Sequence, residues 1–330
     1  MKTIAFFNNK GGVGKTSLAY HLAWMYADLG LRAIAADLDP QANLTSMFLD
    51  EDRLEELWEK DNGAGTVYGA LQPLFEGTGD VRPARIEEAA EDLALLVGDL
   101  RLSAAEDELN QQWPRCLSGE VRAFRVISAL YRIMVEAGQR IDAHLALIDV
   151  GPNLGALNRA VLVAADFVVV PLAPDLFSLQ GLRNVGPALR RWRQEWKDRL
   201  QRKPDAEITL PAGSMRPLGY VVMQHAVRLD RPVRAYAKWM GRIPAAYAEH
   251  VMDERQASGH SPADKDLNCL ATLKHYRSLM PMAMEARKPI FALTPADGAI
   301  GAHATAAMEC RKDFERLARK IADGCGIAIP

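Results

Sequence analysis

The sequence predicts an α/β fold, with a doubly wound, mostly parallel sheet flanked by helices. Residues 2–8 form a short apolar run, and residues 17–29 place apolar side chains at helical spacing. Residues 31–37 form a second apolar run that ends in a carboxylate, and Gly30 ends the helix before it. Two strands joined by a helix make a βαβ unit, whose strands are parallel.

Four further apolar runs, rich in β-branched residues as buried parallel strands are, extend the predicted sheet. They lie at Leu93–Val97, Leu145–Asp149, Phe167–Pro171 and Leu218–Met223. We expect one domain over residues 1–330, with a helical insertion at about 50–140. Proline, glycine and polar residues predict two loop insertions, at about 200–217 and 253–266.

The composition is typical of a globular protein with a near-neutral charge. Hydrophobic residues make up 49% and charged residues 25%, so we expect a sizeable core and no disorder. The net charge of -2 excludes a globally basic nucleic-acid-binding protein but not a local basic face. No signal peptide or membrane-length apolar run is present, and the four cysteines are scattered. We therefore expect a cytoplasmic protein with reduced thiols.

Residues 8–17 have the pattern of a phosphate-binding loop between the first strand and the first helix. Glycines let backbone N–H groups surround phosphate oxygens, and the helix N-terminus adds the positive end of its dipole. Lys15 would reach the β- and γ-phosphates, and the Thr16 hydroxyl would ligate Mg²⁺. The predicted nucleotide contacts are Lys10, Gly11, Gly12, Val13, Gly14, Lys15, Thr16 and Ser17.

The loop departs from the common pattern, because Asn9 stands where the first glycine usually lies and Lys10 opens the loop. Its KGGVGKT form resembles the deviant Walker A loop of the ParA/MinD family. The resemblance implies an ATPase with ATP and Mg²⁺ as cofactors, in which Lys10 crosses a dimer interface to the partner's nucleotide. ATP binding would then drive homodimerisation, and hydrolysis would release the dimer.

Two carboxylate segments complete the resemblance. Residues 37–41, DLDPQ, match the family's DxDPQ segment, so Asp39 would position the attacking water. Asp37 would support Mg²⁺ and Lys15. Leu145–Asp149 has the Walker B form, in which Asp149 holds Mg²⁺ through water.

Residues 151–155, GPNLG, stand where the family commonly has two prolines, a serine, a leucine and a glycine. Gly151 adds backbone freedom to this loop, which is expected to sense the γ-phosphate. The turn after Met223 is expected to help select adenine. Further ParA-like segments lie at residues 66–68, 93–109, 171–182 and 285–290. Because the chain starts at the first strand, it resembles the short form of ParA.

Basic side chains gather in residues 183–203 and 228–242. Clustered Lys and Arg side chains neutralise phosphates and give sequence-independent, salt-sensitive binding. The alternative is a solvated helix face with ion pairs on its surface. The predicted DNA contacts are Arg190, Arg193, Lys197, Arg228, Arg231, Arg234, Lys238 and Arg242.

These features predict a ParA-like partition ATPase that positions a plasmid, chromosome or other cargo on non-specific DNA. Its hydrolysis would be slow and stimulated by a ParB-like adaptor. The alternative is a MinD-like or regulatory nucleotide switch that acts through a protein partner or a membrane without binding DNA. Residues 314–321 could form an amphipathic membrane anchor, but we expect them to pack on the sheet.

Overall fold

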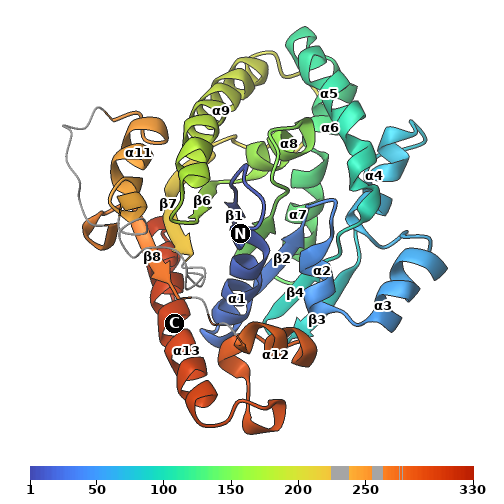
Figure 1. The fold of residues 1–330 in the computed structure, drawn as a ribbon. Coiled ribbons are helices and arrows are strands. Elements are labelled where there is room, and N and C mark those ends of the chain that lie inside the picture. Colours follow the sequence, from blue (N-terminus) through green and yellow to red (C-terminus); the bar gives the residue numbers. More distant parts are fainter. Residues whose placement is uncertain (224–237, 255–262, 275, 277) are drawn as a thin grey trace.

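One eight-stranded sheet runs through the molecule, in the order β3-β4-β2-β5-β1-β6-β7-β8 (Figure 1). All neighbouring strands are parallel except β3 and β4. The computed structural model describes residues 1–223, 238–254, 263–274, 276 and 278–330. The strands are β1 (Lys2–Phe6), β2 (Ala33–Asp37), β3 (Ile86–Ala90), β4 (Leu93–Leu96), β5 (Leu145–Asp149), β6 (Phe167–Leu172), β7 (Arg216–Met223) and β8 (Cys269–Leu273).

Helices cover both faces of this sheet (Figure 1). Alternate residues of a strand point to opposite faces, and on β1 Ile4 and Phe6 join one core whereas Ala5 joins the other. On the Ile4 side the main helices are α1 (Lys15–Asp28), α2 (Asn43–Phe48), α12 (Leu279–Ala286) and α13 (Ala302–Cys325). On the Ala5 side they are α4 (Val67–Phe75), α5 (Ala105–Arg115), α6 (Val121–Ile127), α7 (Ala129–Arg140), α8 (Ala156–Ala164), α9 (Leu176–Leu200) and α11 (Ile243–His250). The predicted doubly wound fold is confirmed.

The structure differs from the prediction at both edges of the sheet. The segment expected as a helical insertion carries α3 (Glu51–Glu55), the helices α4 to α7 and β4, which was predicted, but it also supplies β3, which was not. The sequence analysis missed β3 because two of its five residues are glutamates, which an edge strand can keep half-exposed. One of them, Glu87, accepts hydrogen bonds from Arg53. The short strand β8 at the other edge was also missed.

In the first predicted loop, residues 201–215 contain no helix or strand, and β7 begins at Arg216. In the second predicted loop, residues 255–262 lie outside the described part of the chain.

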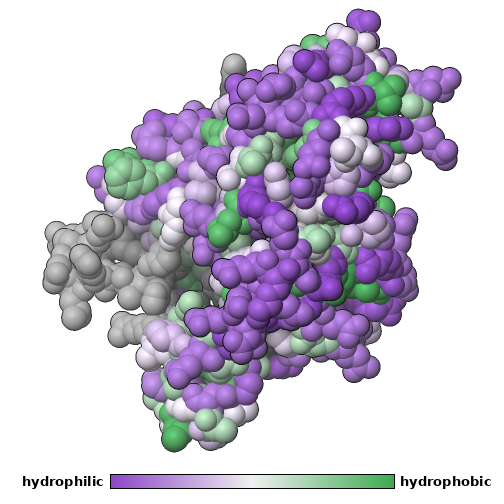
Figure 2. Space-filling view, turned by 90° about the vertical axis from the view of Figure 1, so that its right-hand side faces the viewer, coloured by the Kyte–Doolittle hydropathy of each residue, from purple (hydrophilic) through white to green (hydrophobic). Residues whose placement is uncertain are grey.

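The molecular surface on the side that carries α3 to α5 is mainly hydrophilic, and its hydrophobic residues form small separate patches (Figure 2). Within the described ranges, no helix combines the length and apolarity that crossing a bilayer requires.

The C-terminal helix packs on the sheet, as predicted. Phe314, Leu317 and Ile321 are buried in the same core as α1. The Tyr26 hydroxyl of α1 also donates a hydrogen bond to the Ala318 carbonyl at 2.9 Å. The apolar face that a membrane anchor would need is therefore covered by the protein itself.

Candidate functional site

The loop between β1 and α1 forms an open cradle. Gly12 and Gly14 have φ angles of 69° and 83°, a left-handed conformation that favours glycine. A Cβ atom at Gly11 or Gly12 would meet no atom within 4 Å, so the loop backbone is open to an approaching group. The first turn of α1 contains no acidic residue, and the positive end of its dipole therefore stays available to an anion.

A buried asparagine that the sequence analysis did not single out fixes this loop. The Asn8 amide donates to the Pro171 carbonyl of β6 at 2.7 Å, and its carbonyl oxygen accepts the Lys10 N–H at 3.0 Å. Asn8 is fully buried. Its position at the end of a strand was the available signal, since the loop after that strand must be anchored before it can hold phosphate.

Three aspartates gather behind the cradle, at the carboxyl ends of β2 and β5. Asp37 and Asp149 are directly paired in the register of these neighbouring strands. Lys15 is buried beside them with 6% of its surface exposed. Burial lowers the pKa of Lys15, and the charges of Asp149 and Asp39 oppose that shift.

The Asp149 carboxylate suits a hard cation. It is fully buried, and its Oδ2 has no hydrogen-bond partner among the described residues. Burial raises the pKa of Asp149, the nearby Asp37 charge raises it further, and a hydrogen bond from Thr16 opposes both. A magnesium ion held by Thr16 and Asp149 would supply the missing partner. Mg²⁺ in protein sites usually keeps several waters and binds substrate phosphates, so phosphate and water would complete the coordination.

Asp37 holds the surrounding backbone. Its carboxylate accepts the Thr45 N–H at 2.7 Å and the Asp39 N–H at 3.3 Å. Thr45 in turn accepts the Gly98 N–H with its hydroxyl at 2.9 Å. Asp37 therefore joins the loop after β2 to the end of β4, and its contribution to a metal site stays a prediction.

Asp39 lies against the cradle and also approaches the loop after β5. Its Oδ1 accepts the Gln41 N–H at 3.0 Å, and only 6% of the residue is exposed. A Cβ atom at Gly151 would lie 3.3 Å from that same oxygen. The glycine at this position therefore leaves space for Asp39.

Lys10 is held within its own chain. Its ammonium group forms an ion pair with Asp175, the residue before α9, and lies 5.7 Å from the centre of the Phe177 ring. Burial opposes ionisation of Asp175, but hydrogen bonds from Lys10 and Ser178 outweigh it and lower the pKa of that carboxyl. Phe177 is 70% exposed, so Lys10 lies at the surface beside an apolar side chain.

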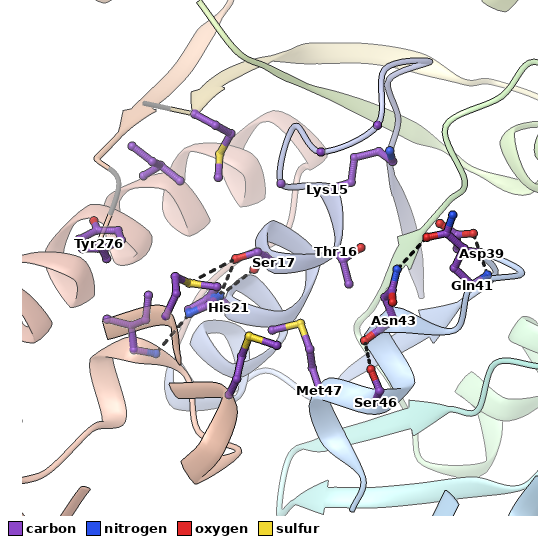
Figure 3. A pocket seen from close by; sticks show the side chains of 18 of the residues that line it. Lys15, Thr16, Ser17, His21, Asp39, Gln41, Asn43, Ser46, Met47 and Tyr276 are labelled. Carbon is purple, nitrogen blue, oxygen red and sulfur yellow. Dashed lines mark hydrogen bonds between the residues drawn. The ribbon is translucent and has the colours of Figure 1, made fainter. Parts of the chain in front are cut away.

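A cavity of about 650 Å³ extends from the cradle. Lys15, Thr16 and Asp39 surround one end, and Tyr276 lies at the other (Figure 3). The predicted residue Met223 lines this cavity, with its side chain over Gly14. Sequence reasoning missed the apolar wall formed by Leu273, Tyr276, Met280, Met284, Ile290 and Phe314.

His21 lines the cavity and contacts backbone groups at both of its ends. Its Nδ1 lies 2.7 Å from the Ser17 carbonyl oxygen, and its Nε2 accepts the Ile290 N–H at 3.2 Å. The ring stacks on Phe314 with the two centres 5.0 Å apart. Burial lowers the pKa of His21 to about 4 although the Ser17 carbonyl opposes the shift, so the ring is neutral.

The predicted DNA-contact residues fall into three groups. Arg190 donates to the His250 and Val251 carbonyls, and Arg193 donates to the Ser214 and Met215 carbonyls, so both guanidinium groups bind backbone within the chain. Exposed basic side chains are Lys197, Lys238 and Arg242. Arg228, Arg231 and Arg234 lie outside the described residues.

A glycine-rich loop that opens a helix, a buried lysine and strand-end aspartates on a doubly wound sheet define a P-loop nucleoside triphosphatase. The model of the AAA_31 family, described as an AAA domain, matches residues 1–202. The chain belongs to this family and to the ParA/MinD family of ATPases that the loop resembles.

Curated relatives include chromosome partitioning proteins. The chain is 33% identical to Protein IncC of Escherichia coli over 195 residues, which cover 59% of this chain and 47% of that protein. It is 31% identical to the chromosome partitioning protein ParA of Caulobacter vibrioides over 201 residues, covering 61% and 67%. The chain spans about half the length of the first two relatives, of which it covers 47% and 42%.

Solved structures share the fold. The protein DIP2308 from Corynebacterium diphtheriae has a TM-score of 0.73 at 24% identity, covering 98% of this chain and 99% of that one. The ATP complex of a McdA variant from Cyanothece has a TM-score of 0.63 at 16% identity, covering 99% and 97%.

Proposed function

We propose that this protein is an ATP-dependent dimerisation switch that binds DNA non-specifically and hydrolyses ATP to position a plasmid, chromosome or other cargo. The observation that carries the proposal is that Lys15 and Asp39 meet at one end of the cavity, beside an open backbone cradle, with the buried Asp149 close enough to act on the Lys15 charge. Phosphoryl transfer depends mainly on such positioning and on charge stabilisation. The proteins similar to this one include plasmid and chromosome partition proteins.

Each group has a separate task in this proposal. The cradle N–H groups and Lys15 bind the phosphates, and Asp39 orients the attacking water. Thr16 and Asp149, with Asp37 behind them, hold Mg²⁺, which when bound neutralises charge on the phosphate oxygens. On dimerisation the Lys10 ammonium group leaves Asp175 and binds the nucleotide of the partner subunit, so that the complete site forms in the dimer.

The DNA proposal depends on Lys197, Lys238 and Arg242, whose side chains are exposed. We infer that the protein works in the cytoplasm, on nucleoid DNA, and that a ParB-like adaptor speeds a slow intrinsic turnover. The buried apolar face of α13 favours DNA or protein attachment over a membrane anchor built from that helix. The departures at Gly151 and Asn153 support a second candidate, a regulatory nucleotide switch with little turnover.

The test measures ATP hydrolysis and duplex DNA binding at low salt, with ATP or ADP. We expect ATP-dependent DNA binding that Lys197→Glu weakens and higher salt reverses. Lys312→Glu is the matched control, because Lys312 is also exposed but lies on α13, which covers the opposite face of the sheet. Lys15→Ala should lower ATP hydrolysis by at least about 100-fold, the scale of removing a group that stabilises transition-state charge.

If the ATP-loaded protein dimerises but does not bind duplex DNA, the proposed DNA role is wrong and the regulatory switch is favoured. If nucleotide neither binds nor is hydrolysed, both candidates fail.

A further inference from the structure

The loop after β5 leads into a helix whose start is capped from elsewhere in the chain. The first N–H groups of a helix have no partner within it, and a serine, threonine or aspartate just before the helix usually accepts one of them. Here that residue is Gly155, which has no side chain. Instead, the Glu106 carboxylate of α5 accepts the Ala156 N–H at 2.5 Å and the Leu157 N–H at 2.8 Å.

The same loop is tied to α8 by a buried asparagine. The Asn158 amide donates to the Gly151 and Asn153 carbonyls, both at 2.8 Å. Asn153 also accepts the Gly155 N–H with its side chain at 2.9 Å. The conformation of residues 151–155 therefore depends on the position of the first turn of α8. Gly151 in this loop lies against Asp39.

Glu106 and Gly155 depend on each other. A Cβ atom at Gly155 would lie 2.4 Å from the Glu106 Oε1 and 2.9 Å from the Asn153 Oδ1, so a side chain there would have to displace the capping carboxylate and move the Asn153 amide. The backbone itself does not need glycine there, because φ is -77° and ψ is -178°, an extended conformation open to any residue. The Glu106 and Asn153 side chains, and not the backbone conformation, therefore oppose a local cap at this position.

The helix that carries Glu106 is fixed on its other sides. The Trp113 indole donates to Glu195 of α9 at 3.0 Å, and Arg122 of α6 donates to Glu108 at 2.8 Å. Glu106 thus connects the loop beside Asp39 to helices that lie outside the nucleotide cavity.

We propose that Glu106 is a positioning residue, which sets the conformation of residues 151–155 for ATP hydrolysis by capping α8 from α5. The inference rests on the proposed ATPase function. Glu106 touches no reacting group in it; it acts through the Ala156 and Leu157 N–H groups, and through them on Gly151 and Asp39.

The test compares kcat with nucleotide affinity. Glu106→Ala should lower kcat for ATP about tenfold, because small misplacements at a reacting centre are costly. The KM for ATP and the Kd for ADP should stay within about twofold, since the cradle and Lys15 are unaffected. Glu108→Ala is the matched control: it removes a carboxylate and an ion pair from the same helix without touching the loop, and should keep the wild-type kcat.

A second variant separates positioning from general stability. Removing Glu106 takes away the closer of the two atoms that a side chain at Gly155 would meet, and after a small movement of the Asn153 side chain a serine there would cap α8 locally. Glu106→Ala combined with Gly155→Ser should therefore recover kcat to within about threefold of wild type, whereas Gly155→Ser alone should be impaired. The inference is overturned if Glu106→Ala keeps the wild-type kcat, if kcat and nucleotide affinity fall together, or if the double variant does not recover.

A readout without turnover distinguishes this inference from the ATPase proposal. Amide hydrogen exchange of residues 151–160 should become faster in Glu106→Ala and slow again in the double variant, with Glu108→Ala unchanged. If the wild-type protein does not hydrolyse ATP but the variants show this exchange pattern, the ATPase proposal fails, whereas the role of Glu106 in capping α8 is supported. Unchanged exchange in Glu106→Ala would overturn the cap itself.

Discussion

The two ends of the cavity are built by different means. The phosphate end uses backbone N–H groups, Lys15 and aspartates from residues 1–202, the part that the family model matches. The other end uses apolar side chains of β8, α12 and α13 from the remaining residues. The first depends on short spacings along the chain, and the second depends on how distant segments pack. We therefore expect that changes at the phosphate end alter ATP hydrolysis and that changes at the apolar end alter nucleotide affinity.

The largest expected effect is at the phosphate end, where Lys10→Ala should abolish ATP-dependent dimerisation. The Lys10 ammonium is paired with Asp175 in the single chain, and in the dimer it would pair with the partner's nucleotide. ATP affinity should change by less than about fivefold, because Lys15 and the cradle remain and a solvent-accessible charge pair is worth at most about 1 kcal/mol. Sedimentation with a non-hydrolysable ATP analogue measures the dimer, and a fluorescent nucleotide measures affinity.

Asp175→Asn is the matched control for this experiment. An asparagine can still accept the Ser178 N–H and cap α9, but it no longer holds the Lys10 charge. This variant should dimerise at least as well as wild type. A dimer that forms normally in Lys10→Ala would show that the lysine has no role across the interface.

The same contrast explains what the sequence could predict. The loop at residues 8–17 and the acids at Asp39 and Asp149 follow fixed local spacings, so they were found without the structure. The Glu106 contact joins residues 50 positions apart, and no local pattern indicates it. Leu273, Met280 and Phe314 were missed because apolar residues at helix or strand spacing look the same whether they fill a core or line a cavity. β3 was missed because an edge strand can carry glutamates.

His21 joins the two ends, and we expect it to make stability pH-dependent. In the unfolded chain its pKa is near 6.5, whereas burial lowers the folded value to about 4. The unfolded state therefore binds the proton first, and stability is lost as pH falls from about 6.5 towards 4. Between pH 7 and pH 5 the loss from this group is about 2 kcal/mol.

Urea unfolding at several pH values measures this loss. His21→Gln should flatten the change between pH 7 and pH 5, because glutamine can bond to backbone groups without titrating. His303→Gln is the control, since His303 lies at the surface, where its Nε2 meets the Ser278 hydroxyl. An equally steep pH dependence in His21→Gln would assign the effect to other groups.

The smallest expected effect is at the apolar end, where Met280→Ala should weaken nucleotide binding about fivefold. Met280 lines the cavity, with its sulfur 4.0 Å from the Ser17 hydroxyl, and truncating it removes roughly 1 kcal/mol of apolar contact with a bound base. At saturating ATP, kcat should stay within about twofold, because the reacting phosphate lies at the opposite end. Met308→Ala, at an exposed methionine of α13, is the matched control. If Met280→Ala instead lowered kcat and left affinity unchanged, the two ends could not be separated, and the apolar wall would not be where the base binds.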